Sequence, residues 1–179
     1  MDVLIFLTTG FEEIEALATI DILRRGGVDI RSVSLIDDKV VTSGRNISVI
    51  TDYMFDEVDF DAVKMLILPG GTVKINEHDG LKSKIVEFVK DNKSIAAICA
   101  APMVFGGLGL LKGKKATCYP GYEKYLIDAE VTGEPVVVDG NITTGRAAGY
   151  TTNFAFELLR QLKGKETAND IAKKMLISL

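Results

Sequence analysis

The chain has 179 residues, of which 47% are hydrophobic and 26% charged, a composition typical of a globular protein with a full core. Its formal net charge of −4 argues against general nucleic-acid binding, which needs a basic surface. Two cysteines are too few for a disulfide framework, so we expect a reducing compartment. The apolar run 3–7 follows no basic segment and is too short for a signal peptide or a membrane span, so we expect a cytoplasmic protein without membrane contact.

Strands and helices are predicted to alternate from the beginning of the chain. The run 3–7 is apolar throughout, as in a strand covered on both faces. A helix with acidic residues in its first turn follows and ends at Arg25, before two glycines. The next predicted elements are a strand within 29–36, a short hairpin across 40–50, an irregular or short helical segment 55–63 and a buried strand at 64–68.

The same alternation continues in the second half. The predicted elements are a helix over 81–89, a strand at 95–98, a helix from Pro102 to about Leu111, a strand starting at Ala116, a hairpin of 136–138 with 142–144, a helix over 153–162 capped by Thr151 or Thr152, and a helix over 166–177. This order predicts a mostly parallel sheet with helices on both faces. Because neither a repeat nor a linker interrupts it, we expect one domain spanning 1–179.

The segment 94–103 predicts a sharp turn from a buried strand into a helix, with Cys99 at its apex. Ala100 and Ala101 are the small neighbours that such a turn requires, and Pro102 suits the first helical turn. A thiol at this apex would lie beside the positive end of a helix, which favours the thiolate. The alternative is a buried core cysteine without reactivity.

Two further groups follow buried strands. Glu15 shares a helix face with Phe11, Ala18 and Ile22, so its carboxyl lies on an apolar stripe. It either reaches water at the edge of that stripe or is buried, with a raised pKa, as a proton donor. Gly70 and Gly71 either let backbone N–H groups face a ligand or form a plain tight turn.

In parallel sheets ligands bind beyond the carboxyl ends of the strands, and there Glu15, the 70–71 turn and Cys99 are expected to meet. Phosphate-loop and dinucleotide-binding fingerprints are absent from the sequence. The single histidine, His78, and the two cysteines have no metal-ligand spacing, so we expect no metal. We interpret His78 as a solvated loop residue and Cys118 as a core residue of a strand.

Three segments resemble the DJ-1 (ThiJ/PfpI) superfamily in order and spacing: 10–15 (GFEEIE), 68–71 (LPGG) and 96–102 (AAICAAP). The resemblance extends over the whole chain to the segment 145–157, and it is greatest to the small single-domain DJ-1-like subfamily. It implies an α/β flavodoxin-like three-layer sandwich with a mostly parallel sheet, of the class I glutamine amidotransferase-like type. It also implies a homodimer.

By position, Cys99 resembles the family's oxidisable nucleophile on its elbow, and Glu15 resembles the protonated acid that hydrogen-bonds to it. The resemblance also assigns oxyanion-type backbone donors to Gly70, Gly71 and Ala100, and residues of the pocket or the dimer side to Arg25, Arg45, Tyr119 and Arg146. The activities that it implies are glyoxalase and deglycase chemistry on 2-oxoaldehydes and their adducts without a cofactor, redox sensing through a cysteine sulfinate, chaperone activity and, in another branch, proteolysis.

One departure from the family pattern concerns Tyr119, which stands where many members have a histidine. Because a phenol is a poor base at neutral pH, a protease or amidotransferase mechanism lacks its general base. Two hypotheses remain open and use the same residues. The first is an enzyme in which Cys99 and Glu15 act on a small reactive carbonyl, and the second is a non-catalytic stress protein in which Cys99 reacts with an oxidant.

Overall fold

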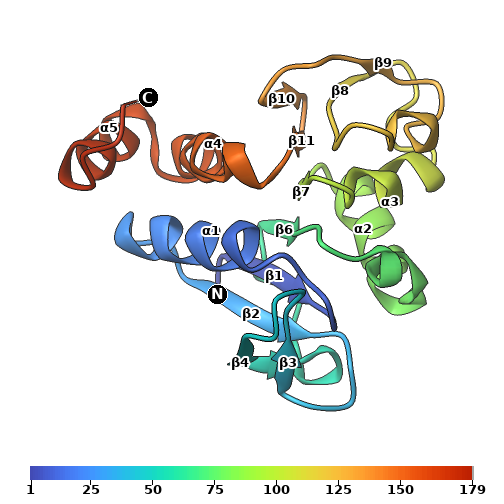
Figure 1. Ribbon diagram of the computed structural model, residues 1–179, viewed down its shortest axis with the longest axis horizontal. Helices are drawn as coiled ribbons and strands as arrows, with labels where there is room; N and C mark the ends of the chain where they lie inside the picture. Colours follow the sequence, from blue (N-terminus) through green and yellow to red (C-terminus); the bar gives the residue numbers. More distant parts are fainter. Residues whose placement is uncertain (179) are drawn as a thin grey trace.

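The computed structural model describes residues 1–178 and centres on one seven-stranded sheet (Figure 1). The strands of this sheet are β1 (Val3–Leu7), β2 (Ile30–Ser34), β5 (Tyr53–Met54), β6 (Met65–Leu68), β7 (Ser94–Ile98), β10 (Val136–Asp139) and β11 (Ile142–Gly145). Their order is β10-β11-β7-β6-β1-β2-β5. Every neighbouring pair is parallel except β10 with β11, which form the predicted hairpin.

Helices cover both faces of the sheet, so the fold is the expected three-layer α/β sandwich. The helices on one face are α1 (Glu13–Arg25), α4 (Thr151–Lys163) and α5 (Lys165–Lys174), and those on the other are α2 (Asp79–Lys90) and α3 (Pro102–Gly107). Outside the sheet lie β3 (Val40–Thr42) with β4 (Ser48–Ile50), β8 (Lys115–Ala116) with β9 (Glu130–Val131), and the 3-10 helices η1 (Phe55–Glu57), η2 (Val73–Glu77), η3 (Glu123–Tyr125) and η4 (Ala148–Tyr150). None of the helices described is long and apolar enough to cross a bilayer.

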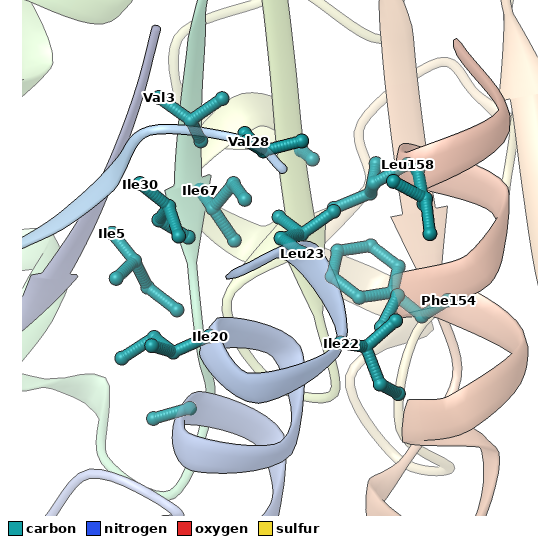
Figure 2. Packing of buried hydrophobic residues seen from close by; sticks show 14 of the residues in the cluster. Val3, Ile5, Ile20, Ile22, Leu23, Val28, Ile30, Ile67, Phe154 and Leu158 are labelled. Carbon is teal, nitrogen blue, oxygen red and sulfur yellow. The ribbon is translucent and has the colours of Figure 1, made fainter. Parts of the chain in front are cut away.

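The apolar run of β1 is explained by the two cores that the sheet separates. Val3, Ile5 and Leu7 belong to the cluster beneath α1, α4 and α5. Leu4 and Phe6 belong to the cluster beneath α2 and α3. Figure 2 shows the first cluster, in which side chains of β1 and β6 meet those of α1 and α4. A strand buried on both faces cannot alternate with polar residues, which is why its sequence does not.

The strand order produces a topological switch point at the carboxyl edge of the sheet. The chain passes from β1 to β2 and then crosses back to β6 on the other side of β1. The connections that leave β1 and β6 therefore diverge, as at the ligand-binding switch points of doubly wound sheets. Here the two loops are tied together, since the Glu12 N–H donates to the Gly70 carbonyl at 2.9 Å. The Gly10 N–H donates to Thr42 O at 2.8 Å and so ties in the β3–β4 hairpin.

Three predicted helix ends were wrong. The helix after Cys99 ends at Gly107 rather than near Leu111, since Gly109 has a φ of +72° and cannot continue it. The last helix ends at Lys174 instead of 177. Neither threonine caps α4, because Thr151 is its first residue and the Thr151 hydroxyl donates to Ala148 O.

Two predictions about strands also needed correction. Only Lys115–Ala116 is extended where a strand through Cys118 was expected, and it pairs with β9 instead of joining the main sheet. Strand β5 was missed, because its pairing with β2 depends on a long-range contact between Asp52, which directly precedes β5, and Ser32 of β2. Asp52 accepts hydrogen bonds from the backbone N–H and the hydroxyl of Ser32 at 2.8 and 2.9 Å, which fastens this edge.

Candidate active site

Cys99 occupies the strained elbow that the sequence predicts. Its φ is +66°, in the left-handed region that costs a residue with a side chain about 1–2 kcal/mol. The backbone is held on both sides, since the Cys99 N–H donates to Gly145 O at 2.9 Å and the Cys99 carbonyl accepts from the Tyr119 N–H at 2.8 Å. The thiol stays partly exposed. These contacts fix the sulfur beyond the carboxyl end of β7.

Glu15 is buried rather than at the edge of the apolar stripe, with 1% of its surface exposed. The Gly70 N–H donates to Glu15 Oε2 at 2.7 Å, although 55 positions separate the two residues. A methyl group at Gly70 would lie 2.9 Å from Glu15 Oε2 and 3.1 Å from Cys99 Sγ. The carboxyl and the thiol therefore flank the same point above β6.

Glu12 has a role in this site that the sequence reasoning missed. Its carboxylate caps α1 by accepting the Glu15 N–H at 2.7 Å, and its own N–H binds Gly70 O. Glutamate is not a preferred capping residue, so the acidic first turn predicted a favourable charge but not this bond. The cap fixes the turn of α1 that carries Glu15.

Burial raises the pKa of the Glu15 carboxyl from its ordinary 4.5 to about 7, and the charge of Glu12 acts in the same direction. The Gly70 N–H and the neighbouring Cys99 thiol lower the pKa without cancelling this effect. The expected buried carboxyl with a raised pKa is therefore present. At neutral pH it can both hold and release a proton, as a general acid or base requires.

The prediction of a Cys99 thiolate stabilised by a helix end was wrong for the resting site. Burial, together with the negative charge of Glu15, raises the pKa of the Cys99 thiol to about 12. Backbone N–H groups of Ala100 and Gly71 bind the sulfur and lower this pKa, but desolvation and the carboxylate outweigh them. Helix α3 begins only at Pro102 and has six residues, so its dipole is small. The thiol thus keeps its proton while Glu15 is ionised.

The two carboxyl oxygens of Glu15 differ in their surroundings. Oε2 accepts the Gly70 N–H, so a proton on this carboxyl belongs on Oε1. Oε1 is also buried, and within residues 1–178 it makes no hydrogen bond. The Cys99 thiol lies beside the Glu15 carboxyl group, so a proton can pass between the two groups without crossing bulk water.

The three predicted backbone donors have different positions. Gly71 and Ala100 both direct N–H groups at Cys99. Gly71 has a φ of +91°, and a methyl group there would lie 2.3 Å from Glu12 N, so the turn requires glycine. The Gly70 N–H is bound to Glu15 and does not face a ligand. Gly70 therefore serves the site by its small size and by fixing the carboxyl.

Of the predicted arginines, Arg25 is not brought to the site. It forms an ion pair with Asp21 at 2.7 Å in the last turn of α1, about 15 Å along the helix from Glu15. Arg45 is exposed in the β3–β4 turn, whose Gly44 N–H donates to Phe11 O near the start of α1. Arg45 is thus in the turn beside the start of α1 but makes no hydrogen bond to Cys99 or Glu15.

Tyr119 helps to hold the elbow through its backbone, and Arg146 follows Gly145, which also holds it. The Tyr119 N–H binds Cys99 O, and its side chain is 46% exposed. Arg146 follows Gly145, and its guanidinium donates to Gly133 O. Cys118 is buried at 4% exposure, as predicted for a core residue, and both cysteines are free thiols.

His78 is a loop residue, as predicted, but it is only partly exposed and has a structural role that the sequence did not indicate. Its Nδ1 accepts the Leu81 N–H at 3.0 Å and so caps α2, and its ring packs on Phe55 with centroids 4.5 Å apart. This imidazole has a structural role at the start of α2. Across residues 1–178, no group of three histidine, cysteine, aspartate or glutamate side chains is arranged to hold a metal ion.

The fold and the site define a flavodoxin-like α/β protein whose cysteine lies on a strand–helix elbow beside a buried glutamate. The chain belongs to the DJ-1/PfpI family, whose model matches residues 1–161. It is 33% identical to protein dj-1beta of Drosophila melanogaster over 98% of this chain and 96% of the relative. It is 32% identical to the deglycase PfpI of Pyrococcus furiosus over 91% of this chain and 100% of that protein.

Other relatives are longer, and this chain spans 41% of DJ-1 homolog B of Arabidopsis thaliana, with 33% identity. Solved structures agree with the fold over its whole extent. The crystal structure of Drosophila DJ-1beta matches with a TM-score of 0.94 at 30% identity, covering 100% of both chains. The structure of oxidised Toxoplasma gondii DJ-1 matches with a TM-score of 0.95 at 30% identity, covering 99% of both.

Proposed function

We propose that this protein is a cofactor-independent enzyme that acts on 2-oxoaldehydes or their adducts, with Cys99 as nucleophile and Glu15 as acid and base. The observation that carries the proposal is the buried Glu15 carboxyl beside the Cys99 thiol at a strained elbow. Archaeal relatives that share about a third of the sequence carry the name deglycase, which supports this class of reaction.

In the first step, Cys99 Sγ attacks the aldehyde carbon of a 2-oxoaldehyde. A carbon–sulfur bond forms, and Glu15 takes the thiol proton and passes it to the carbonyl oxygen, which gives a hemithioacetal and leaves Glu15 as a carboxylate again. Because the Cys99 pKa is about 12 and the Glu15 pKa about 7, the carboxylate rather than water is the base for this transfer. Gly71 and Ala100 N–H groups lie beside the sulfur, where developing negative charge needs donors.

In the second step, Glu15 moves the remaining aldehyde proton from the first carbon to the second. The former ketone becomes an alcohol and the first carbon becomes a thioester. Water then cleaves the carbon–sulfur bond, releasing a 2-hydroxy acid and the free thiol. Overall, one water is added and no electron donor or acceptor is consumed, so the reaction needs no redox cofactor.

The test is release of lactate from methylglyoxal by wild type, Cys99→Ser, Glu15→Gln and Cys118→Ser. We expect turnover in wild type and Cys118→Ser and its loss in the other two variants. Equal rates in all four proteins would disprove the proposal. Because Nδ1 of the single histidine of the sequence, His78, is bound to the Leu81 N–H and Tyr119 replaces the histidine of many relatives, we expect slow turnover and no peptidase or amidotransferase activity.

A second candidate function is redox sensing through a Cys99 sulfinate. It is favoured by the Gly71 and Ala100 N–H groups at the sulfur and by the likeness to an oxidised DJ-1 structure. Sulfinate oxygens would accept these N–H groups and a proton from Glu15. Intact mass and peptide mapping after mild peroxide test this role, and two added oxygens confined to Cys118 would exclude it.

The proposed assembly is a homodimer built on an exposed apolar surface. This surface combines Ile14 and Leu17 of α1 with Val40, Ile47 and Ile50 of the β3–β4 hairpin, exposed by 37 to 79%. The Gly44–Phe11 hydrogen bond holds the hairpin beside the start of α1, so these side chains gather in one region. Sedimentation of wild type and Ile50→Glu tests it, with a dimer expected for the first and a monomer for the second.

A further inference from the structure

Two buried polar atoms on one face of α1 lack partners. Glu15 Oε1 and Thr19 Oγ1 are both fully shielded from solvent and make no hydrogen bond among the residues described. Thr19 is 0% exposed and lies four residues after Glu15. A buried hydroxyl can donate one hydrogen bond, and a carboxyl oxygen can accept it. No hydrogen bond joins the two atoms directly, and native proteins rarely leave such groups unpaired, so a buried water between them would satisfy both.

The Thr19 hydroxyl is not used as helix threonines commonly use theirs. Thr167 in α5 donates to the carbonyl of Lys163 one turn earlier, at 3.0 Å. Thr19 makes no corresponding bond to its own helix, so its hydroxyl is available to another group. Side chains on a helix lean toward its N-terminus, and residues four apart have Cβ atoms about 5–6 Å from each other. Thr19 and Glu15 therefore lie one turn apart on the same face of α1, a separation that one water can bridge.

We propose that Thr19 is a positioning residue for Glu15, and that one buried water joins the Thr19 hydroxyl to Glu15 Oε1. Oε2 is already fixed by the Gly70 N–H, so this contact orients the second oxygen and completes the hydrogen bonding of the carboxyl. The proposal rests on Glu15 as the acid and base of the proposed function, and it concerns a residue outside the three family-like segments.

The contact has a definite effect on the proton shared by Glu15 and Cys99. A donor at Oε1 stabilises the carboxylate, and hence the form in which Cys99 keeps its proton. Without this donor, Glu15 holds its proton to higher pH. Once Glu15 and Cys99 together have lost one proton, a larger fraction of the molecules then carries the negative charge on the sulfur. The titratable groups that act on Glu15 in the described structure are Cys99 and Glu12, and both are unchanged in the test below.

The test is the rate of Cys99 alkylation by iodoacetamide between pH 5 and 9, which requires no turnover. One hydrogen bond of ordinary strength corresponds to about 0.5–1 pH unit. For Thr19→Val we expect the midpoint to rise by this amount and the rate above it to rise about 3- to 10-fold. Thr19→Ser should restore both values. Thr117→Val is the matched control, since the Thr117 hydroxyl is also buried and unpartnered in the described residues but follows β8 rather than lying on α1.

Unfolding by urea gives an independent readout. Loss of a real hydrogen bond makes Thr19→Val less stable than wild type, whereas an unpaired hydroxyl replaced by a methyl group makes the variant equally or more stable. A wild-type alkylation profile in Thr19→Val, with unchanged or higher stability, would overturn the proposal. Thr19→Ala, which cannot overpack the site, replaces the valine variant if that protein does not fold. Failure of the methylglyoxal assay alone would leave the alkylation result intact, so the two proposals fail separately.

Discussion

The buried carboxyl of Glu15 makes the stability of this protein depend on pH in a predictable direction. Its folded pKa is about 7 against an ordinary 4.5, so the folded state binds this proton more tightly than the unfolded state. The stabilisation from this proton is complete below pH 4.5 and is lost as the pH rises through 7. A difference of about 2.5 pKa units corresponds to about 3 kcal/mol, an upper bound because the site can relax around the charge.

The perturbation is Glu15→Gln, which keeps the shape and an acceptor for the Gly70 N–H but does not titrate. The free energy of unfolding of both proteins is measured by urea titration followed by circular dichroism, from pH 4.5 to 8 at constant ionic strength. We expect wild type to gain up to about 3 kcal/mol relative to the variant as the pH falls from 8 to 4.5. A flat difference between the two curves would refute the reasoning, since Glu15 would then titrate as in the unfolded chain.

Glu157 provides a control of opposite sign. Burial acts to raise the pKa of the Glu157 carboxyl, but hydrogen bonds from Arg160 and Gln161 hold this pKa below its ordinary value. The stabilisation from Glu157 is therefore present at neutral pH and is lost as the pH falls through the folded pKa. We expect Glu157→Gln to give a small difference curve that slopes the other way, by less than about 1 kcal/mol, because Arg160 is half exposed.

Three other variants test parts of the site and the sheet. Gly70→Ala places a methyl group 2.7 Å from Cys99 Cβ, so we expect the free energy of unfolding in urea to fall by about 1–3 kcal/mol and the rate of Cys99 alkylation to change. The control Gly107→Ala, whose methyl group meets nothing within 4 Å, should show neither effect. Cys99→Gly should be about 1–2 kcal/mol more stable than Cys99→Ala, because only glycine relieves the left-handed backbone; equal stabilities would show that the elbow is unstrained. Asp52→Ala removes the acceptor of two Ser32 bonds and should cost about 1–3 kcal/mol in the same measurement, and a neutral result would mean that water replaces it.

The sheet and the elbow were predictable because their signals are local. A short apolar run such as 3–7, in a chain where strands and helices alternate, indicates a strand buried on both faces, and small residues around Cys99 have a direct steric reason. The state of Glu15 was not predictable in this way. A glutamate on an apolar stripe has the same sequence pattern whether it reaches water or not, and only Gly70, 55 positions away, decides between the two.

The ionisation of Cys99 shows a second limit of sequence reasoning. The helix end and the N–H groups of Gly71 and Ala100 favour the thiolate, while burial and Glu15 oppose it. Whether the pKa of the Cys99 thiol is raised or lowered overall depends on the distances to these groups, and residue types do not give distances. Strand β5 was missed for a related reason, since two residues of strand have no period and their pairing depends on Asp52 and Ser32.

The burial of Cys118 gives this protein a native reporter of its own opening. In the folded chain this sulfur is packed in the core beneath α2 and α3, with 4% of its surface exposed, and burial raises its pKa to about 11. In the unfolded chain it is an ordinary thiol. Labelling of Cys118 therefore reports opening of the core around this residue, while labelling of Cys99 follows the resting site. Both signals can be read from one peptide map without any engineered probe.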